Sequence, residues 1–575
     1  MQLPSNGIDS LISMSSDQYS AWNPGIISKI PEDYKFLETI YDPANCFSNL
    51  QNIDELARET GIKHEELVVF KPARLALHEV IIRITADIVV VEGEQEESLG
   101  VNFRKIADKI LSDYIQPKLA DIESCYEKMR ASVKSQIEQE FSDSLFASIK
   151  PTATPKSFWS FLKPKPNKPA TPVESLAEKE FGIVSSYREK GLIASDPQTS
   201  AIYRSLYRVL GAIISKRGFL GQDKSFLVEL CTDHVCNSFG ARSIGKIVHE
   251  IAIQTISDQG YQMIPEAEKA ILISLKGTSA AGKSSLRPRL RQIMSELGMI
   301  NGHYGTISPD IWRRLLLDYA PLGEAYKYAG RLTSYEVIII DSKLDQYIRG
   351  KAQKRQSIPH LMVDRFRFDS FASEKVSRVL HKTYVKYIDT MYMYFVITPP
   401  EATVERGWTR GLARGRYKSV EDFLGHSVEA YAGIPKLLFK YLSSTQPKYI
   451  FEFLDNDVPI DHYPLLIAKG TQGMMDIYDP TGLVNIVRFQ KINIMAQSAD
   501  EVYAHKAMFS AEKNLEFLQQ CIAKIEHVRF IDIETETVYL TFKNGRHQSS
   551  DQEMLNQKST DSELKTIFER VVPDS

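Results

Sequence analysis

Two glycines separated by four residues, then a lysine and a serine, are the clearest sign of chemistry in this chain. They form the run Gly277-Thr-Ser-Ala-Ala-Gly282-Lys283-Ser284, which fits the phosphate-binding pattern G-x-x-x-x-G-K-[ST]. Such a loop wraps a phosphate with backbone N–H groups, and a Cβ at the glycines would obstruct the wrap. Lys283 would then reach the β- and γ-phosphates of a nucleoside triphosphate, and the Ser284 hydroxyl would bind Mg²⁺. The predicted nucleotide contacts are Gly277, Thr278, Ser279, Ala280, Ala281, Gly282, Lys283, Ser284 and Ser285.

The residues on either side of this loop favour a phosphate site over an inert turn. The run "AILISLK" before it is typical of a buried strand, and "SSLRPRLRQIMSEL" after it is typical of a helix. Pro288 falls near the start of that helix, where its missing N–H costs little. The positive end of the helix dipole would face the bound anion. We therefore expect a P-loop that binds a nucleoside triphosphate.

Other motifs narrow the kind of P-loop protein. The guanine-binding N-K-x-D motif of GTPases is missing from the sequence, and no apolar run ends in the Asp-Glu pair of motor ATPases. Two acids are candidates for the end of a third strand, Asp341 after "EVIII" and Asp364 after "HLMV". Apolar residues recur every three or four positions around Asp341, which also fits a helix. We favour Asp364 as a metal ligand and substrate contact, with Arg365 beside it as a further substrate contact, and Asp341 stays the alternative.

A kinase also needs a group that positions the acceptor hydroxyl. Asp310 and Arg313 in "YGTISPDIWRRLL" are three residues apart, on one face of a predicted helix start. Asp310 would accept a hydroxyl proton while Arg313 holds the substrate. The alternative is structural, because Ser308-Pro309-Asp310 is also a favourable start for a helix.

Arginines that close over the transferring phosphoryl group are the other requirement. In "ERGWTRGLARGRYKSV", Arg406, Arg410 and Arg414 recur every four residues, and Arg416 follows. Like charges at this spacing repel one another, and a bound polyanion would relieve the repulsion. Guanidinium groups pair with phosphate oxygens through two parallel N–H groups and keep their charge. We interpret the segment, with its interspersed glycines, as a lid, and a solvated basic face is the alternative.

The elements that would position these residues alternate between strand and helix, which implies a parallel sheet with right-handed crossovers. The fold class expected is multidomain, with an α/β P-loop core, a mainly helical N-terminal region and a small α+β C-terminal region. The core strands are expected at 270–276, 303–308, 360–364, 391–398 and 448–455, and the helices at 284–297, 310–319, around 324–355, 372–388, 400–414 and 420–442.

Prolines concentrated between Pro151 and Pro172 indicate an extended linker between domains. Whether residues 76–93 run from helix into strand is not settled by periodicity. Towards the C-terminus, residues 474–494 and 528–545 favour strands around a helix at 499–525, followed by a mobile polar tail. The expected parts are a mainly helical domain at 1–150, the linker at 151–172, a helical region at 173–265, the P-loop domain at 266–458 and an α+β region with a polar tail at 459–575.

In their order, these motifs resemble the zeta-toxin family of P-loop kinases, over about residues 270–457. The resemblance rests on the P-loop, on the D-x-x-R of Asp310 and Arg313, on "VITPPE" leading into the arginines, and on "GR" at 415–416. It implies transfer of a phosphate from ATP, with Mg²⁺, to the 3′-hydroxyl of UDP-N-acetylglucosamine. It also implies that Asp310 is the general base, that Lys283 and Ser284 bind phosphate and metal, and that Arg406 and Arg416 clamp the phosphate.

The family's substrate is not carried over to this chain. Its third strand reads "MVDRFRF" where many relatives have Asp-Gly-Thr, so we expect a different acceptor pocket. The long flanking regions have no counterpart in a minimal toxin, and they would bind a protein partner or suit a secreted bacterial effector.

Composition excludes several classes of protein. Apolar residues make up 43% of the chain, which is ordinary for a globular protein. The net charge is −3, so the chain has no overall positive charge that would indicate binding to nucleic acid. Five cysteines are too few for a disulfide scaffold, and the cluster of Cys231, His234 and Cys236 favours buried thiols over a metal site. Neither a signal peptide nor a membrane span is expected. The expected location is the cytoplasm of a bacterium, or a host cytosol for a secreted effector.

The sequence thus predicts an ATP- and Mg²⁺-dependent phosphotransferase whose acceptor is a small molecule, such as a sugar nucleotide, or a macromolecule. One alternative is an interaction protein that nucleotide binding gates without phosphoryl transfer. Others are a polynucleotide 5′-hydroxyl kinase, against which the near-neutral charge argues, and a nucleotidyltransferase.

Overall fold

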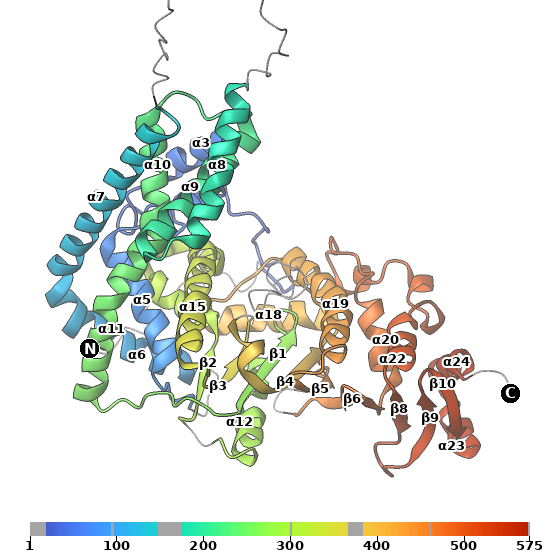
Figure 1. Cartoon of the computed structure of the whole chain (residues 1–575). Helices are drawn as coiled ribbons and strands as arrows, with labels where there is room; N and C mark the ends of the chain where they lie inside the picture. Colours follow the sequence, from blue (N-terminus) through green and yellow to red (C-terminus); the bar gives the residue numbers. More distant parts are fainter. Residues whose placement is uncertain are drawn as a thin grey trace, which may run out of the picture. The chain divides into compact units, whose positions relative to one another are not determined.

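The computed structural model describes residues 19–93, 97–147, 175–299, 302–365, 383–459 and 462–572 (Figure 1). The chain forms two compact units. The helical unit comprises residues 36–80 and 110–254, and the sheet unit comprises residues 1–35, 81–109 and 255–575. The proline-rich linker expected at 151–172 lies outside the described residues, and the expected domain boundaries stay a prediction.

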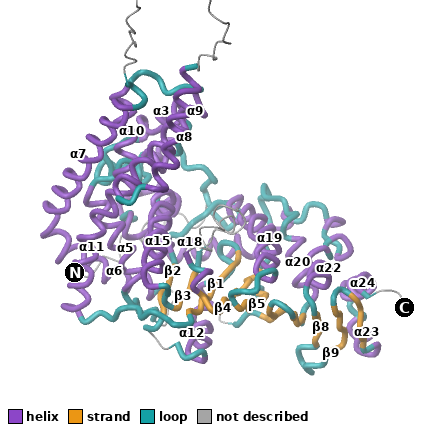
Figure 2. Tube along the Cα trace, in the orientation of Figure 1, coloured by secondary structure: helices purple, strands orange, loops and turns teal. Residues whose placement is uncertain are grey.

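The helical unit contains no named β-strand among its described residues (Figure 2). Helix α5 (Pro72–Asp87) settles the ambiguous segment at 76–93, because it is helical up to Asp87. This helix and α11 (Ala241–Gln259) each extend from the helical unit into the sheet unit. The other helices of the unit are α3 (Leu50–Thr60), α4 (His64–Leu67), α7 (Leu119–Asp143), α8 (Leu176–Ile193), α9 (Pro197–Arg217) and α10 (Lys224–Val235).

The sheet unit is built on ten strands in the order β10-β9-β8-β7-β6-β5-β4-β1-β3-β2. All neighbours from β2 to β5 are parallel, with Leu272 of β1 opposite Leu361 of β3 and Thr390 of β4 opposite Lys448 of β5. The parallel α/β core predicted from the alternation is therefore confirmed. Its strands are β1 (Ala270–Gly277), β2 (Tyr304–Ile307), β3 (His360–Val363), β4 (Ile388–Ile397) and β5 (Lys448–Asp455).

Most core helices lie where the sequence placed them. Helix α12 (Arg287–Glu296), preceded by a short 3-10 turn, follows the P-loop, and α18 (Pro400–Arg414) and α19 (Val420–Leu442) coincide with the predicted ranges. The helix expected at 310–319 is shorter, comprising the 3-10 helix η6 (Pro309–Trp312) and α13 (Arg313–Leu316). Most of the helix expected at 372–388 lies outside the described residues, and β4 already begins at Ile388.

Strand β3 settles which acid follows the third strand. It ends at Val363, so Asp364 is the next residue, whereas Asp341 lies within α15 (Ser334–Arg355). The long helix expected around 324–355 is interrupted: the 3-10 segment η7 (Ala320–Tyr328) and α14 (Ala329–Leu332) precede α15.

Beyond β5 the sheet continues with short, mostly antiparallel strands. Strand β6 (Leu465–Thr471) pairs antiparallel with β5, and β7 (Met474–Ile477), β8 (His527–Ile531), β9 (Val538–Lys543) and β10 (Arg546–Ser550) follow at its edge. The α+β character predicted for this region is thus confirmed, as a continuation of the core sheet. The short helices α20 (Pro480–Arg488), α21 (Ala499–Val502) and α22 (Glu516–Lys524) lie between β7 and β8 in the chain.

Three details of the C-terminal prediction were wrong. Residues 480–488 form α20 (Pro480–Arg488), because Asp479 caps the first turn through the backbone N–H groups of Thr481 and Gly482. The helix expected at 499–525 is broken into α21 (Ala499–Val502) and α22 (Glu516–Lys524). The polar tail is structured, because it forms β10, α23 (Gln552–Lys558) and α24 (Ser562–Val571).

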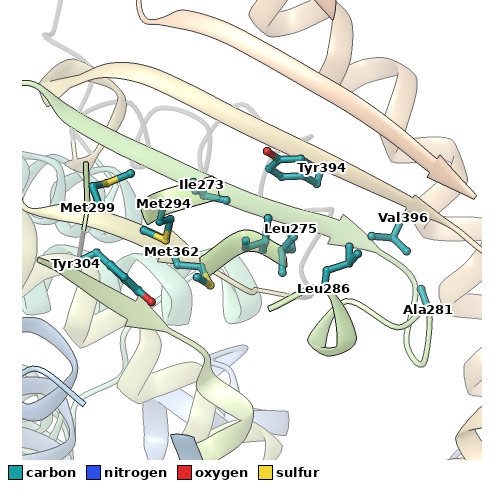
Figure 3. Packing of buried hydrophobic residues seen from close by; sticks show 11 residues of the cluster. Ile273, Leu275, Ala281, Leu286, Met294, Met299, Tyr304, Met362, Tyr394 and Val396 are labelled. Atoms are coloured by element: carbon teal, nitrogen blue, oxygen red, sulfur yellow. The ribbon is translucent and has the colours of Figure 1, made fainter. Parts of the chain in front are cut away.

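A compact apolar cluster holds the P-loop helix against the sheet (Figure 3). Ile273 and Leu275 of β1 and Met362 of β3 meet Leu290 and Met294 of α12 there, and all five are buried. Because this packing fixes where β1 ends and α12 begins, it also fixes the loop between them.

None of the helices in the part of the chain that the structure describes combines the length and apolar character needed to cross a lipid bilayer.

Truncating the α12 side of this cluster should loosen the sheet unit. Leu290 is 1% exposed, so Leu290→Ala should lower the free energy of unfolding by about 2–5 kcal/mol, through lost burial and a cavity. Leu297, which is 38% exposed just after the same helix, is the matched control, and Leu297→Ala should cost less than about 1 kcal/mol. Urea unfolding of the two variants measures the difference, and equal losses would contradict this packing.

Candidate active site

The predicted P-loop lies at the carboxyl end of β1, as the sequence required. Strand β1 ends at Gly277, and Ala280 and Gly282 turn the loop with φ angles of 60° and 84° before α12 begins. Gly277 is needed for packing, because a Cβ there would lie 2.8 Å from the carbonyl oxygen of Val396 on β4. Gly282 supplies a left-handed turn, and its missing Cβ leaves space for the amide of Asn456.

The ends of neighbouring elements hold this loop in place. The Ala281 carbonyl accepts hydrogen bonds from Asn456 Nδ2 (2.8 Å) and Thr398 Oγ1 (3.2 Å). Thr398 directly follows β4 and Asn456 directly follows β5, so the loop is tied to both strands. On its other side, Thr278 Oγ1 lies 3.3 Å from Ser427 Oγ of α19. The sequence analysis missed these three supports, although two of them stand where parallel strands end.

Lys283 folds back over its own loop. Its ammonium donates to the carbonyl oxygens of Gly277 (3.0 Å) and Thr278 (2.8 Å). Burial lowers the pKa of Lys283, Asp364 opposes this effect, and the positive charge of Arg410 adds to it. A bound phosphate would stabilise the charged form of Lys283, so the loop favours an anionic ligand.

Asp364 lies at the carboxyl end of β3, next to the strand that leads into the loop. Its N–H donates to the Ile307 carbonyl of β2 (2.9 Å), and its carboxylate lies 3.6 Å from the Arg287 guanidinium. Ser284 opens the helix after the loop. A hydroxyl and a carboxylate are the hard oxygen donors that Mg²⁺ prefers, with phosphate and water completing the shell. Among the described residues no three His, Cys, Asp or Glu side chains are grouped to hold a metal on their own.

The carboxylate of Asp310 is shared by two arginines. Arg313 Nε donates to one oxygen (2.9 Å) and Arg416 donates to the other (2.5 Å). Although burial opposes it, the charges of Arg416 and Arg313 hold the pKa of Asp310 well below its usual range. Arg313 also donates to Thr333 Oγ1 (2.8 Å), so it is itself held firmly. The structure thus brings Asp310, Arg313 and Arg416 together.

The three arginines of α18 do not share one task. Arg410 lies close enough to Lys283 to affect its pKa. Arg406 donates to the Val458 carbonyl (3.2 Å), and Arg414 lies 3.4 Å from a carboxylate oxygen of Glu97. Four residues turn a helix by about 40° beyond one full turn, so Arg406 and Arg414 are offset by about 80° around the helix axis. Arg410 acts on Lys283, whereas Arg416, which follows the helix, joins Arg313 on Asp310.

The guanidinium of Arg365 is paired with carboxylates of the protein itself. Its guanidinium lies 2.9 Å from the carboxylates of both Asp341 and Asp345 on α15. These charges raise the pKa of Arg365 although its burial opposes the shift. These ion pairs tie Arg365 to α15, and its expected contact with substrate stays a prediction.

Two further residues near Asp310 were missed by the sequence analysis. Lys418 follows Arg416 by two residues, and its amine lies 3.4 Å from Nδ1 of His426 on α19. Burial, then the charge of Arg410, lowers the pKa of Lys418 to about 7, although Asp310 opposes this effect. Burial, then Lys418, lowers the pKa of His426 to about 3. No pattern in the sequence marks this pair, because a loop and a helix bring the two residues together.

The cysteine cluster of the helical unit is built around two buried thiols. Cys231 and Cys236 are free and buried, and His234 Nδ1 lies 2.7 Å from the Ser205 hydroxyl. Burial raises the pKa of both thiols, to about 11 for Cys236.

Comparison with known proteins gives little further support. No family model and no curated protein matches the chain. Two solved structures are similar. One is the native AvrRxo1-ORF1:-ORF2 complex, with 11% identity and a TM-score of 0.25 over 39% of this chain and 64% of that chain. The other is AvrRxo1-ORF1:-ORF2 with ATP, with 11% identity and a TM-score of 0.29 over 42% of this chain and 68% of that chain. Likenesses this weak carry no argument about function.

The shared carboxylate predicts a pH-dependent effect on stability. A carboxylate whose pKa is lowered on folding stabilises the fold above its unfolded pKa of about 3.9, and this contribution is lost as the pH falls. Asp310→Asn should therefore lower the thermal unfolding midpoint at pH 7, where two arginines lose their counter-charge. The difference from the unsubstituted protein should shrink as the pH falls below about 4.

The exposed Asp500, whose carboxylate accepts none of the described hydrogen bonds, is the control, and Asp500→Asn should leave the midpoint unchanged at every pH. A deficit in Asp310→Asn that stays constant from pH 7 to pH 3 would show that the carboxylate is not held by the two arginines.

Proposed function

We propose that the chain is a phosphotransferase that moves the γ-phosphate of ATP to a hydroxyl group. One observation carries the proposal. The carboxylate of Asp310, with Arg313 and Arg416 on its two oxygens, lies within electrostatic reach of the P-loop lysine, Lys283. A P-loop alone binds a nucleotide, whereas a carboxylate and arginines facing it are what phosphoryl transfer requires.

In the donor half of the site, the loop would hold the triphosphate. Lys283 would exchange the carbonyls of Gly277 and Thr278 for phosphate oxygens, at little cost because its charge is already desolvated. Arg410 would neutralise charge on the same phosphates. Ser284 and Asp364 would hold Mg²⁺, which when bound bridges phosphate oxygens and neutralises their developing charge.

In the acceptor half, Asp310 would orient the hydroxyl that attacks. A new bond forms between the acceptor oxygen and the γ-phosphorus, and the bond to the β-phosphate oxygen breaks, leaving its electron pair on ADP. Arg416 would stabilise the transferring phosphoryl group, since it contacts Asp310 and its charge acts on Lys283. Because both oxygens of Asp310 face guanidinium groups, we assign Asp310 to orienting the hydroxyl more than to removing its proton.

The acceptor is proposed only as a chemical class. It is a hydroxyl group of a small molecule, such as a sugar nucleotide, or of a macromolecule. We propose that the helical unit contributes to its selection or binds a protein partner, since the phosphate chemistry is complete within the sheet unit.

Isotope transfer tests the function. The protein with Mg²⁺ is incubated with γ-labelled ATP, and in parallel with α-labelled ATP, against sugar nucleotides, nucleosides, oligonucleotides and cell lysate. Label should move from the γ-position only, to a species that is not an oligonucleotide. Transfer from the α-position would show a nucleotidyltransferase, and a labelled 5′-hydroxyl would show a polynucleotide kinase. ATP binding without any transfer or hydrolysis would show a nucleotide-gated interaction protein.

Two variants should separate the donor half from the acceptor half. Lys283→Ala should weaken ATP binding at least tenfold, measured by calorimetry, because the phosphate loses a buried cation. Asp310→Asn should keep ATP affinity within about threefold and lower turnover by roughly 10²-fold or more, because the acceptor hydroxyl loses its orientation. Lys269, an exposed lysine just before β1, is the matched control, and Lys269→Ala should behave like the unsubstituted protein. Retained turnover in Asp310→Asn would contradict the assigned acceptor half.

A further inference from the structure

The first described residues of the chain, 19–28, contact the elements around the arginines of the site. They form no named helix or strand, so contacts with other segments must hold them in place. Their partners belong to η7, α18 and α19, which lie 301 to 394 residues further along the chain. We call residues 19–28 the strap, and residues 414–419, which contain Arg416, the arginine segment.

An apolar cluster joins the strap to α18 and α19. Ala21 is 7% exposed and packs with Val404 of α18 and Phe423 of α19. Trp22 lies against the same cluster, as does Ala280 of the P-loop. The strap, both helices and the phosphate loop therefore share one packed region.

Hydrogen bonds give this packing a defined direction. Trp22 Nε1 donates to the Glu405 carboxylate of α18 (2.7 Å). At the first turn of α19, Ser28 donates through its N–H to Glu421 (3.0 Å) and through its hydroxyl to Asp422 (3.0 Å). The strap is thus bonded both to the helix that leads into the arginine segment and to the helix that follows it.

The strap also holds η7. The Lys327 ammonium donates to the Pro24 carbonyl (3.1 Å) and lies 3.5 Å from the centre of the Tyr19 ring, a favourable place for a cation. The Ile27 N–H donates to the Tyr328 hydroxyl (3.3 Å). Backbone and side chains of the strap therefore both fix the end of η7.

The same end of η7 supports the arginine segment. The hydroxyl of Tyr326 lies against Gly415, where a Cβ would overlap it, and its ring meets that of Tyr417 edge-on, with 6.2 Å between the ring centres. Gly415 and Tyr417 flank Arg416, whose guanidinium donates to Asp310. Arg416 is therefore connected to the strap through η7 as well as through α18 and α19.

We propose that the strap holds Arg416 in place for phosphoryl transfer, with Trp22 as its positioning residue. The inference rests on the proposed function, in which Arg416 stabilises the transferring group. A charge that is already fixed needs no reorganisation at the moment of reaction, so it acts best on a rigid support. Loss of the strap contacts would leave the P-loop held by the ends of β4 and β5, but would let α18 and the arginine segment move.

Hydrogen exchange of the full chain without ligand tests this support. Trp22→Ala should speed exchange at the backbone amides of residues 400–419 by about tenfold or more, while α12, which packs in a separate cluster, keeps its rates. Ser28→Ala, a smaller change, should act on the same amides in the same direction. Unchanged exchange at residues 400–419 in both variants would overturn the inference, and so would an equal increase in α12.

Ile27→Ala is the matched control for these variants. Its side chain is 61% exposed, and its backbone N–H stays available to Tyr328. Exchange in residues 400–419 and in α12 should therefore stay as in the unsubstituted protein. Faster exchange at residues 400–419 in this control, equal to that in Trp22→Ala, would show that the anchoring by Trp22 is not specific and would overturn its role.

Turnover with MgATP, measured as ADP release with water as the acceptor, tests the link to Arg416. Trp22→Ala should lower kcat by roughly tenfold to a hundredfold and keep KM for ATP within about threefold. Trp22→Phe keeps an aromatic ring in the cluster and should restore most of kcat. In an Arg416→Lys background, Trp22→Ala should lower kcat by less than about twofold further, because the group that it positions is gone. Losses that multiply would overturn the positioning of Arg416.

The outcomes also separate this inference from the proposed function. An unsubstituted protein that binds MgATP but neither hydrolyses it nor transfers phosphate would overturn the proposed function. The exchange experiment needs no turnover, so it would still show whether the strap holds the arginine segment. An active protein whose Trp22→Ala variant keeps both its exchange rates and its kcat would overturn the role of the strap alone.

Discussion

The ion pairs of Asp310 are the contacts on which the arrangement of the site depends. One carboxylate joins Arg313, which starts the short helix after β2, to Arg416, which follows the helix after β4. These two segments are about a hundred residues apart in the chain, and no strand pairs them directly. Without the carboxylate, the guanidinium groups of Arg313 and Arg416 would repel each other. The two segments that carry them would then no longer be held together at the proposed acceptor side of the site.

The P-loop is fixed separately, by the sheet. Its glycine packs on β4, its carbonyl at Ala281 is held from the ends of β4 and β5, and the apolar face of α12 is buried beneath it. These contacts preorganise the anion site before any ligand arrives, which lowers the cost of binding charge there. The proposed donor half thus rests on strand ends, and the proposed acceptor half rests on an ion-pair bridge.

The segment from Arg414 to Ser419 joins α18 to α19, and Arg416 within it donates to Asp310. The N-terminal residues add a support from outside, because Ser28 Oγ donates to Asp422 (3.0 Å) and Trp22 Nε1 donates to Glu405 (2.7 Å). Arg331 holds Asp422 as well, with its Nε 3.2 Å from the carboxylate. The N-terminal residues thus tie α18 and α19 together through Trp22 and Ser28.

Much of the core could be predicted from the sequence because its signals are local. The P-loop spacing, the apolar run before it and the amphipathic patterns of α18 and α19 each lie within one short window. The partners of the side chains could not be predicted, because they come from segments far apart in the sequence. Arg414 faces Glu97, and Lys418 meets His426 across a helix cap. The four-residue spacing suggested that the arginines share one task on one face of the helix. Each step of four residues adds about 40° of rotation, so Arg406 and Arg414 reach different partners. In the C-terminal region, short apolar runs fit strand and helix equally well, and the capping signal of Asp479 and Pro480 was the one local cue that decided α20.

A crystal structure with Mg²⁺ and a non-hydrolysable ATP analogue would test most directly whether these parts form one active site. The account predicts that the triphosphate lies in the loop from Gly277 to Ser284, with its terminal phosphate within hydrogen-bonding distance of Lys283 and of Arg410 or Arg416. The space beyond that phosphate would be bounded by Asp310. A nucleotide bound elsewhere, or a terminal phosphate that points away from Asp310, would contradict it.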